Sequence, residues 1–272
     1  MFAIRRLHHH FIVMLFAFFT LATSSPCVAA TPDPDAIIAN MKRVFEPPEP
    51  RIADVAITIV TDNGTRETWT GRQARKPYGD GQRSLLYLAQ PQYLHGTALL
   101  IAEAAQAGES ADDAMWIYLP SLDRVRKVTP ADTFQRFLQT DFTYADLGFV
   151  DRRGHTRLLR SVDDDGKPVY EIEFRPTDSW YYSRIVTQID PDTMLPVKRN
   201  YFDRADRLWK VQTFTRMATV NDLPVPLYIE MRDVQQGSLT VIEYSNVVYA
   251  ADLSDELFDP DNLRDLDTLF EH

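Results

Sequence analysis

Apolar and polar residues alternate along most of the sequence after residue 50, and this alternation restricts the chain to a fold dominated by strands. In the segment 167–176, Tyr170, Ile172 and Phe174 fall on one face, while charged residues fall on the other. Short turn-forming sequences such as residues 62–64 separate the alternating segments, which is typical of antiparallel hairpins. About eleven to thirteen strands fit this pattern. The sequence therefore predicts a mainly β domain built on a single curved antiparallel sheet.

A sheet of this size twists and curls, so its concave apolar face needs a cover. Two segments are predicted to be helical and to supply that cover. In the first, residues 33–45, Asp33 is placed to cap a helix on which Ile37 and Met41 share one face. The second, residues 131–147, interrupts the run of strands near the middle of the chain.

The sequence FQRFLQTDFTYADL, residues 134–147, contains most of the aromatic residues of this second segment. Phe134, Phe137 and Leu138 lie at helical spacing, which predicts one helical turn. A second predicted turn carries three more apolar residues, Phe142, Tyr144 and Leu147. Two interpretations remain open, because a plug that completes the core and a lid over a binding cavity both need the same apolar residues.

The N-terminal segment has the pattern of a secretory signal peptide, in which Arg5 and Arg6 precede an apolar run and small residues follow. We therefore predict a signal peptide at residues 1–30 and a mature domain at residues 31–272 that is exported to the periplasm. Cys27 is the only cysteine and lies in the predicted signal peptide. The mature domain then has no disulfide and depends on its core alone.

The charge and the motifs of the mature chain argue against several classes of function. Without Arg5 and Arg6 it has 27 basic and 39 acidic residues, a net charge of −12, which disfavours nucleic acid as a partner. The remaining histidines are too widely spaced for a zinc site, and nucleotide-binding and nucleophile motifs are missing. We therefore expect no metal, no cofactor, no catalytic residue and no enzymatic activity.

Two further patterns are compatible with contacts to a lipid or to a partner. One is a run of aromatic residues just before a strand, Trp180, Tyr181 and Tyr182. These residues suit the rim of a lipid cavity, or equally the packed edge of a hairpin. The other is a basic strand that carries Arg124, Arg126 and Lys127. It suits an anionic headgroup or an acidic partner, or equally a plain exposed strand face.

Four sequence motifs together resemble the LolA-like family of outer-membrane lipoprotein-sorting proteins: MWIYLPSLDRVRKV, TDFTYADL, IDPDTMLPVKRNYFD and ELFDPDNL. The resemblance spans roughly residues 82–263. It implies an incompletely closed antiparallel barrel whose apolar concave side is covered by helices. It also implies a carrier of acyl chains, working beside a lipid-exporting transporter of the resistance-nodulation-division type. In the lipoprotein carrier of this family, an arginine before a proline in a central strand is thought to hold the lid. At the comparable place this chain has Gln90 before Pro91.

These observations lead to the hypothesis of a periplasmic carrier that binds the acyl chain of a lipid or lipoprotein. Its expected partners are an inner-membrane transporter and an outer-membrane acceptor. The alternative is a periplasmic sensor or binding module that recognises an envelope protein. A second rival, to which the sequence gives little support, is a hydrolase with acidic catalytic residues that acts on an envelope polymer. The predicted ligand-binding residues are aromatic, namely Trp116, Tyr118, Phe134, Phe137, Phe142, Tyr144, Trp180 and Tyr182.

Overall fold

The computed structural model describes residues 32–79, 81–103, 114–148, 153–162 and 165–270. The predicted signal peptide at residues 1–30 lies outside these ranges. The described helices are α1 (Pro34–Phe45), α2 (Tyr144–Leu147) and α3 (Leu266–Leu269), with short 3-10 turns at η1 (Gln92–Leu94), η2 (Pro120–Leu122), η3 (Asp255–Phe258) and η4 (Pro260–Asn262). None of the helices in the described ranges combines the length and the apolar character needed to cross a bilayer.

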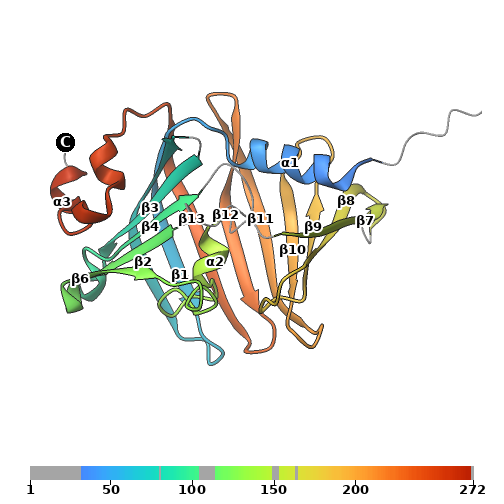
Figure 1. The fold of residues 1–272 in the computed structure, drawn as a ribbon, viewed down its shortest axis with the longest axis horizontal. Coiled ribbons are helices and arrows are strands. Elements are labelled where there is room, and N and C mark those ends of the chain that lie inside the picture. Colours follow the sequence, from blue (N-terminus) through green and yellow to red (C-terminus); the bar gives the residue numbers. More distant parts are fainter. Residues whose placement is uncertain (1–31, 80, 104–113, 149–152, 163–164, 271–272) are drawn as a thin grey trace, which may run out of the picture. The chain divides into compact units, whose positions relative to one another are not determined.

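Within the described ranges, thirteen strands form one antiparallel sheet (Figure 1). The strands are β1 (Arg51–Val60), β2 (Arg66–Tyr78), β3 (Gly81–Gln90), β4 (Ala98–Glu103), β5 (Ala114–Leu119), β6 (Arg124–Val128), β7 (Gly154–Val162), β8 (Pro168–Pro176), β9 (Arg184–Ile189), β10 (Pro196–Phe202), β11 (Leu208–Val220), β12 (Leu223–Asp233) and β13 (Ser238–Tyr249). The sheet is curved and does not close into a barrel. The predicted fold class is confirmed.

The order of the strands explains why a segment crosses the sheet. The order is β6-β5-β4-β3-β2-β1-β13-β12-β11-β10-β9-β8-β7, so β6 and β7 lie at opposite edges although they follow each other in the chain. The connection between them contains residues 129–148, which we call the cover segment. It packs against the sheet between the two edges, where α2 is seen in Figure 1.

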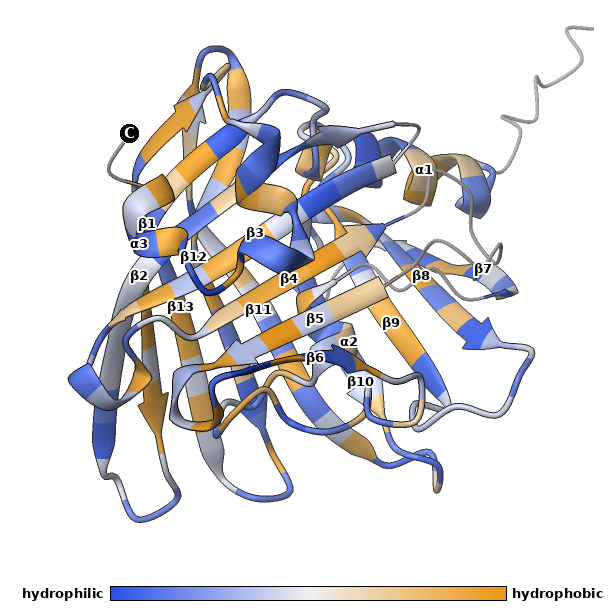
Figure 2. Ribbon diagram, turned by 60° about the vertical axis from the view of Figure 1, so that its left-hand side comes forward, coloured by the Kyte–Doolittle hydropathy of each residue, from blue (hydrophilic) through white to orange (hydrophobic). Residues whose placement is uncertain are grey.

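The period of two predicted from the sequence is present in the sheet. Along β1 every second residue is buried, and these include Val55, Ile57 and Ile59. We call the face that carries them the inner face. It joins one core cluster with Trp69, Ile117 and other apolar residues, and with the cover segment. In Figure 2 most residues of β4 and β5 have the colour of apolar residues.

The opposite, outer face is also covered on one half of the sheet. Residues of β2 to β5 that point to this face, such as Leu85, Leu100 and Tyr118, pack against the C-terminal segment 251–270. Five apolar side chains of that segment are buried there, Leu253, Leu257, Phe258, Leu263 and Leu266. The C-terminal segment therefore closes a second core that the alternation alone does not predict.

The predicted N-terminal helix is confirmed as α1. Asp33 caps it by accepting a hydrogen bond from the backbone N–H of Asp35. Ile37 and Met41 are buried in a small cluster with Ile172 of β8 and other apolar residues. The helix thus covers apolar residues of β8 and β9 beyond the reach of the cover segment.

The prediction of two helical turns in residues 134–147 is only half right. The second turn is α2, begun by a capping box in which Thr143 and Asp146 bond to each other's backbone N–H. The first turn is wrong, because Leu138 has a positive φ of 50° and Phe137 N–H donates to the carbonyl of Phe142 at 2.8 Å. A tight loop closed by these bonds replaces the helix, and it lets Phe137 and Phe142 both reach the core.

Gly71 in β2 occupies a position that no larger residue fits. A Cβ atom there would lie 1.9 Å from the backbone oxygen of Tyr87 on the neighbouring strand, next to an irregularity in the β2–β3 register. We expect Gly71→Ala to lower the free energy of unfolding by about 3 kcal/mol, because the backbone itself must shift. Urea denaturation followed by circular dichroism measures this loss.

Gly148→Ala is the matched control for Gly71→Ala. A Cβ at Gly148 would meet side-chain atoms of Ile101 and Met115 at 3.0 Å, and these atoms move more easily than backbone. Its loss of stability should be the smaller of the two. An equal loss in both variants would contradict the backbone clash at Gly71.

Candidate binding site on the inner face of the sheet

The cover segment is anchored to the sheet by Asp141, which is fully buried. Its carboxylate accepts hydrogen bonds from the hydroxyls of Ser238 at 2.5 Å and Thr240 at 2.8 Å, both on β13. Arg136 of the cover segment lies 3.2 Å from Asp141 and 2.8 Å from Asp233, the last residue of β12. These bonds compensate the burial of the carboxylates of Asp141 and Asp233.

A second anchor holds α2 through Asp146. The ammonium of Lys210, on β11, lies 3.0 Å from Asp146 Oδ2, and Lys210 has an exposed fraction of 0%. The hydroxyl of Tyr182 donates to the same carboxylate at 3.0 Å, and Thr143 N–H donates at 2.8 Å. Burial and the negative charge of Asp146 raise the pKa of Tyr182, so its hydroxyl stays protonated and remains a donor.

Between these anchors the cover segment contacts the inner face of the sheet mainly through apolar side chains. Phe137, Phe142 and Tyr144 are buried in the inner-face core, and the rings of Phe137 and Tyr144 meet edge to face at 5.8 Å. Within the described residues, backbone-to-backbone hydrogen bonds of the cover segment stay inside the segment, for example from Tyr144 N–H to the carbonyl of Gln135, whereas Asp141 N–H donates to the hydroxyl of Thr240. The sheet ladder is therefore complete without the cover segment.

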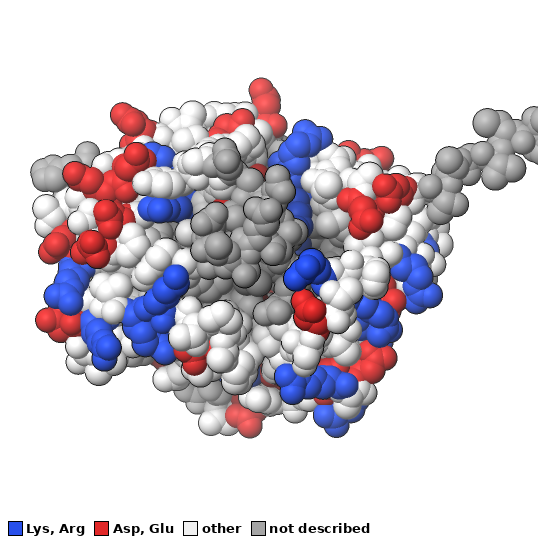
Figure 3. Space-filling model, viewed as in Figure 1, with Lys and Arg blue, Asp and Glu red and all other residues white. Residues whose placement is uncertain are grey.

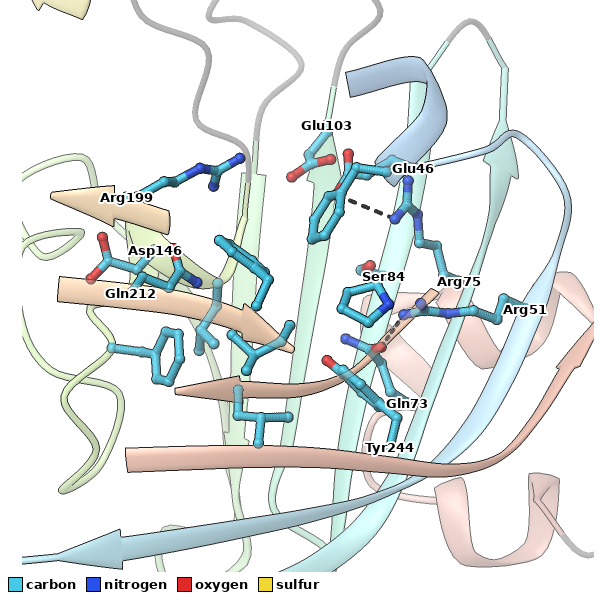
Figure 4. A pocket seen from close by; sticks show the side chains of 17 residues that line it. Glu46, Arg51, Gln73, Arg75, Ser84, Glu103, Asp146, Arg199, Gln212 and Tyr244 are labelled. Carbon is cyan, nitrogen blue, oxygen red and sulfur yellow. Dashed lines mark hydrogen bonds and ion pairs between the residues drawn. The ribbon is translucent and has the colours of Figure 1, made fainter. Parts of the chain in front are cut away.

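A cavity of about 100 Å³ remains on the inner face beside the cover segment. One part of its lining is apolar and includes Phe142 and Leu147 from the cover segment. The other part is charged, with Arg51 and Arg75 on one side and Arg199 near Asp146 on the opposite side (Figure 4). Further lining residues are Phe45, Glu46, Gln73, Ser84, Glu103, Gln212, Phe214, Pro226, Ile229, Ile242 and Tyr244.

The guanidinium of Arg75 is held in an unusual environment at this cavity. Its Nη1 lies 3.2 Å from Glu46 Oε1, the residue that follows α1, and its Nε donates to Gln82 at 2.8 Å. Burial lowers the pKa of Arg75, and the carboxylate of Glu46 opposes that effect. The carboxylate of Glu46 thus stabilises the charged guanidinium of Arg75 against the cost of its burial.

A second, open cavity of about 530 Å³ lies near the C-terminal segment. Its lining includes Arg72, Tyr87, His95 and Asp267, and the Tyr87 hydroxyl donates to Asp267. Tyr87 and His95 thus both contact Asp267, since His95 Nδ1 lies 3.8 Å from its carboxylate. Across the described ranges, no group of three or more His, Cys, Asp or Glu residues is arranged to hold a metal ion.

The structure brings only half of the predicted aromatic residues together on the inner face. The four that share its core cluster are Phe137, Phe142, Tyr144 and Tyr182. Trp180 packs partly buried against that cluster, whereas Phe134 is 53% exposed and its ring centre lies 6.3 Å from that of Tyr181.

Trp116 and Tyr118 lie elsewhere. Both join the outer-face cluster under the C-terminal segment, so they do not line the cavity on the inner face. The alternation in β5 shows that they share a face with each other, but it does not say which face is the inner one.

The predicted basic strand is the edge strand β6, and its cations do not form a single patch. Arg126 lies 3.3 Å from Asp132 of the cover segment, whereas Lys127 lies 5.6 Å from the ring centre of Trp116 on the outer-face side. Figure 3 shows acidic and basic side chains distributed together over the face seen in Figure 1.

Sequence reasoning missed the charged residues of the inner face, although a signal for them exists. Lys210 stands in phase with the buried Phe214 on β11, and Arg51 stands in phase with Val55 on β1. A cation on the apolar side of an amphipathic strand is rare unless it has a partner. Such in-phase cations therefore mark buried ion pairs or ligand sites.

Comparisons with known proteins agree on the fold. A family model described as "Uncharacterized protein" matches residues 80–265. No curated protein matches the chain. A crystal structure of a DUF1329 family protein from Desulfovibrio piger is 26% identical, with a TM-score of 0.77, covering 84% of this chain and 96% of that one.

Two further crystal structures are similar. A putative outer membrane lipoprotein-sorting protein domain from Vibrio parahaemolyticus is 25% identical, with a TM-score of 0.76, covering 84% of this chain and 97% of that one. A LolA superfamily protein from Nitrosomonas europaea is 20% identical, with a TM-score of 0.66, covering 85% and 99% respectively. The resemblance inferred from the sequence motifs is confirmed, and the fold supports a carrier or binding role in general.

Proposed function

Because the chain belongs to the family of uncharacterized proteins whose model matches residues 80–265, and because its fold is LolA-like, we propose that it is a periplasmic, non-enzymatic carrier. Its cargo is the acyl chain of a lipid or lipoprotein. The acyl chain binds to the inner face of the sheet beneath the cover segment and is carried towards the outer membrane. The donor is a lipid-exporting transporter of the inner membrane.

One observation carries this proposal: the cover segment contacts an apolar sheet that is already complete without it. Apart from its two polar anchors, it rests on the inner face through side chains such as Phe137 and Phe142. An acyl chain offers the same kind of contact, because burial of each methylene contributes about 0.8 kcal/mol without specific polar partners. The tail therefore replaces apolar side chains of the cover segment.

The small size of the cavity requires the cover segment to move when cargo binds. A cavity of about 100 Å³ is smaller than the roughly 150 Å³ that accommodates benzene in an apolar core. A long acyl chain then needs the space that Phe137 and Phe142 occupy. Release follows when a membrane acceptor favours the closed form, since a partner shifts an equilibrium only by binding one state more tightly.

Native mass spectrometry of the mature protein, purified gently from an envelope fraction, tests the proposal. We expect a discrete bound mass that lipid extraction identifies as an acylated molecule. Hydrogen exchange supplies a second measurement: the amides of residues 132–147 should exchange faster when the acyl ligand is bound, while those of β12 stay unchanged. A protein that remains bare after incubation with envelope lipids would contradict the carrier role.

The second candidate function is a binding module that recognises an envelope protein. The observation that favours it is the filled core, because Phe137 and Phe142 are buried with little space left around them. In that case the cover segment is a permanent part of the core. A pulldown from envelope extract should then recover an inner-membrane protein, and the yield should not depend on added lipid.

A further inference from the structure

Arg51 and Arg75 face each other across β1 and β2 in the inner-face cavity. Both are buried, with exposed fractions of 9% and 7%, yet Arg51 Nε and Arg75 Nη2 have no hydrogen-bond partner among the described residues. Buried polar groups in folded proteins are almost always paired, because an unpaired one costs free energy. Two unpaired guanidinium nitrogens in one cavity therefore mark a place for an acceptor.

The two arginines differ in their countercharges, in a cavity that is also lined by the carboxylates of Glu46, Glu103 and Asp146. Arg75 pairs with Glu46, whereas Arg51 donates to the neutral side chain of Gln73 and lies 5.3 Å from the ring centre of Tyr244. Within the described ranges Arg51 forms no ion pair. Figure 4 shows both guanidinium groups on the same side of the cavity, with Gln73 and Tyr244 below them.

We propose that Arg51 and Arg75 bind an oxyanion, a carboxylate or a phosphate, and that this oxyanion is the headgroup of the cargo. The second part rests on the proposed carrier function. Guanidinium groups suit this role, because their planar donors match carboxylate and phosphate oxygens in bidentate pairs. A cavity of about 100 Å³ holds a group the size of a few water molecules, which fits a headgroup.

The rest of the cavity explains why the oxyanion belongs to an amphiphile. Much of the remaining lining is apolar, with Phe142 and Leu147 of the cover segment and Phe214, Ile229 and Ile242 of the sheet, while Arg199 and Asp146 lie opposite the two arginines. An anionic head held by Arg51 and Arg75 would thus direct its tail towards the apolar inner face below the cover segment. The cargo class is an acidic amphiphile such as a fatty acid or an anionic phospholipid.

The test measures the affinity of the mature chain for palmitate, for the alcohol of the same chain length and for inorganic phosphate. Displacement of a fluorescent acyl probe reports the first two, and calorimetry reports phosphate. We expect palmitate to bind about ten-fold more tightly than the alcohol, since a hydrogen bond to a charged group corresponds to roughly that factor.

Variants then assign this preference to the two arginines. Arg75→Gln and Arg51→Gln should each weaken palmitate binding by about ten-fold and leave binding of the alcohol unchanged. Arg75→Lys keeps the charge and should restore part of the preference. Arg72→Gln is the matched control, because Arg72 lies on the same strand, has a side chain 46% exposed and does not line the cavity. Circular dichroism confirms that each variant is folded.

The outcomes separate this inference from the carrier function. Equal affinity for palmitate and the alcohol, unaffected by Arg75→Gln and Arg51→Gln, would overturn the oxyanion site and leave the carrier intact. Binding of phosphate alone, lost in the same two variants, would support the oxyanion site and refute the acyl cargo. Binding of none of the three ligands would refute both.

Discussion

Lys210→Met should lower the free energy of unfolding by about 3–5 kcal/mol, the largest loss that we expect from a single charge. Lys210 has an exposed fraction of 0%, and its ammonium is paired with Asp146 of the cover segment. Without it the carboxylate stays buried and loses its ion pair, while neutral donors such as the Tyr182 hydroxyl remain. Urea denaturation of the mature chain measures the loss.

A double variant and a control at a more exposed ion pair test the physical reason for this loss. Lys210→Met combined with Asp146→Asn removes both charges, so it should be more stable than Lys210→Met alone. Lys76→Met removes a strand lysine whose side chain is 19% exposed and whose partner, Asp255, has a side chain 70% exposed. It should cost about 1 kcal/mol. If Lys210→Met and Lys76→Met cost the same, the Asp146 anchor is not a buried ion pair in solution.

Phe137→Ala should lower the free energy of unfolding by about 3–5 kcal/mol, because the cover segment packs through this ring. Phe137 is 1% exposed and belongs to the core cluster of the inner face. The cavity left by the ring adjoins the sheet, whose ladder cannot collapse to fill it. The urea midpoint should fall with little change in the slope of the transition, which would show that the native fold is retained.

Phe134→Ala is the matched control for Phe137→Ala, since both residues belong to the same loop. Phe134 is 53% exposed and touches mainly Tyr181, so its removal should cost less than about 1 kcal/mol. Similar losses in both variants would mean that the cover segment does not pack as described. An unstable Phe137→Ala variant that binds acyl ligands more tightly would favour a movable cover segment over a permanent plug.

The fold could be predicted from the sequence because its main signal is local. The alternation in segments such as residues 167–176 reports which residues share a face, and turn residues report where strands end. Helix α1 was predicted for the same reason, since Asp33, Ile37 and Met41 act within a few residues of one another. The loop at Phe137 was not predicted, because its positive φ at Leu138 depends on bonds that helical spacing does not reveal.

The candidate site could be predicted only in part. The aromatic residues of the motif TDFTYADL are predicted to bind the ligand, and both of them, Phe142 and Tyr144, are buried on the inner face. Its two aspartates received no role, although they anchor the cover segment to β13 and β11. Their partners lie far along the chain, with Lys210 64 residues beyond Asp146.

The amino-acid sequence alone was therefore sufficient for most of the strands, for a number between about eleven and thirteen, and for the residues that share a face of each strand. Tertiary structure decided which face is the inner one, which placed Trp116 and Tyr118 under the C-terminal segment and away from the cavity. It also brought Arg51 and Arg75 together across β1 and β2. The physical reason is that side-chain periodicity is a property of one strand, whereas sheet curvature and charge pairing depend on neighbours supplied by distant parts of the chain.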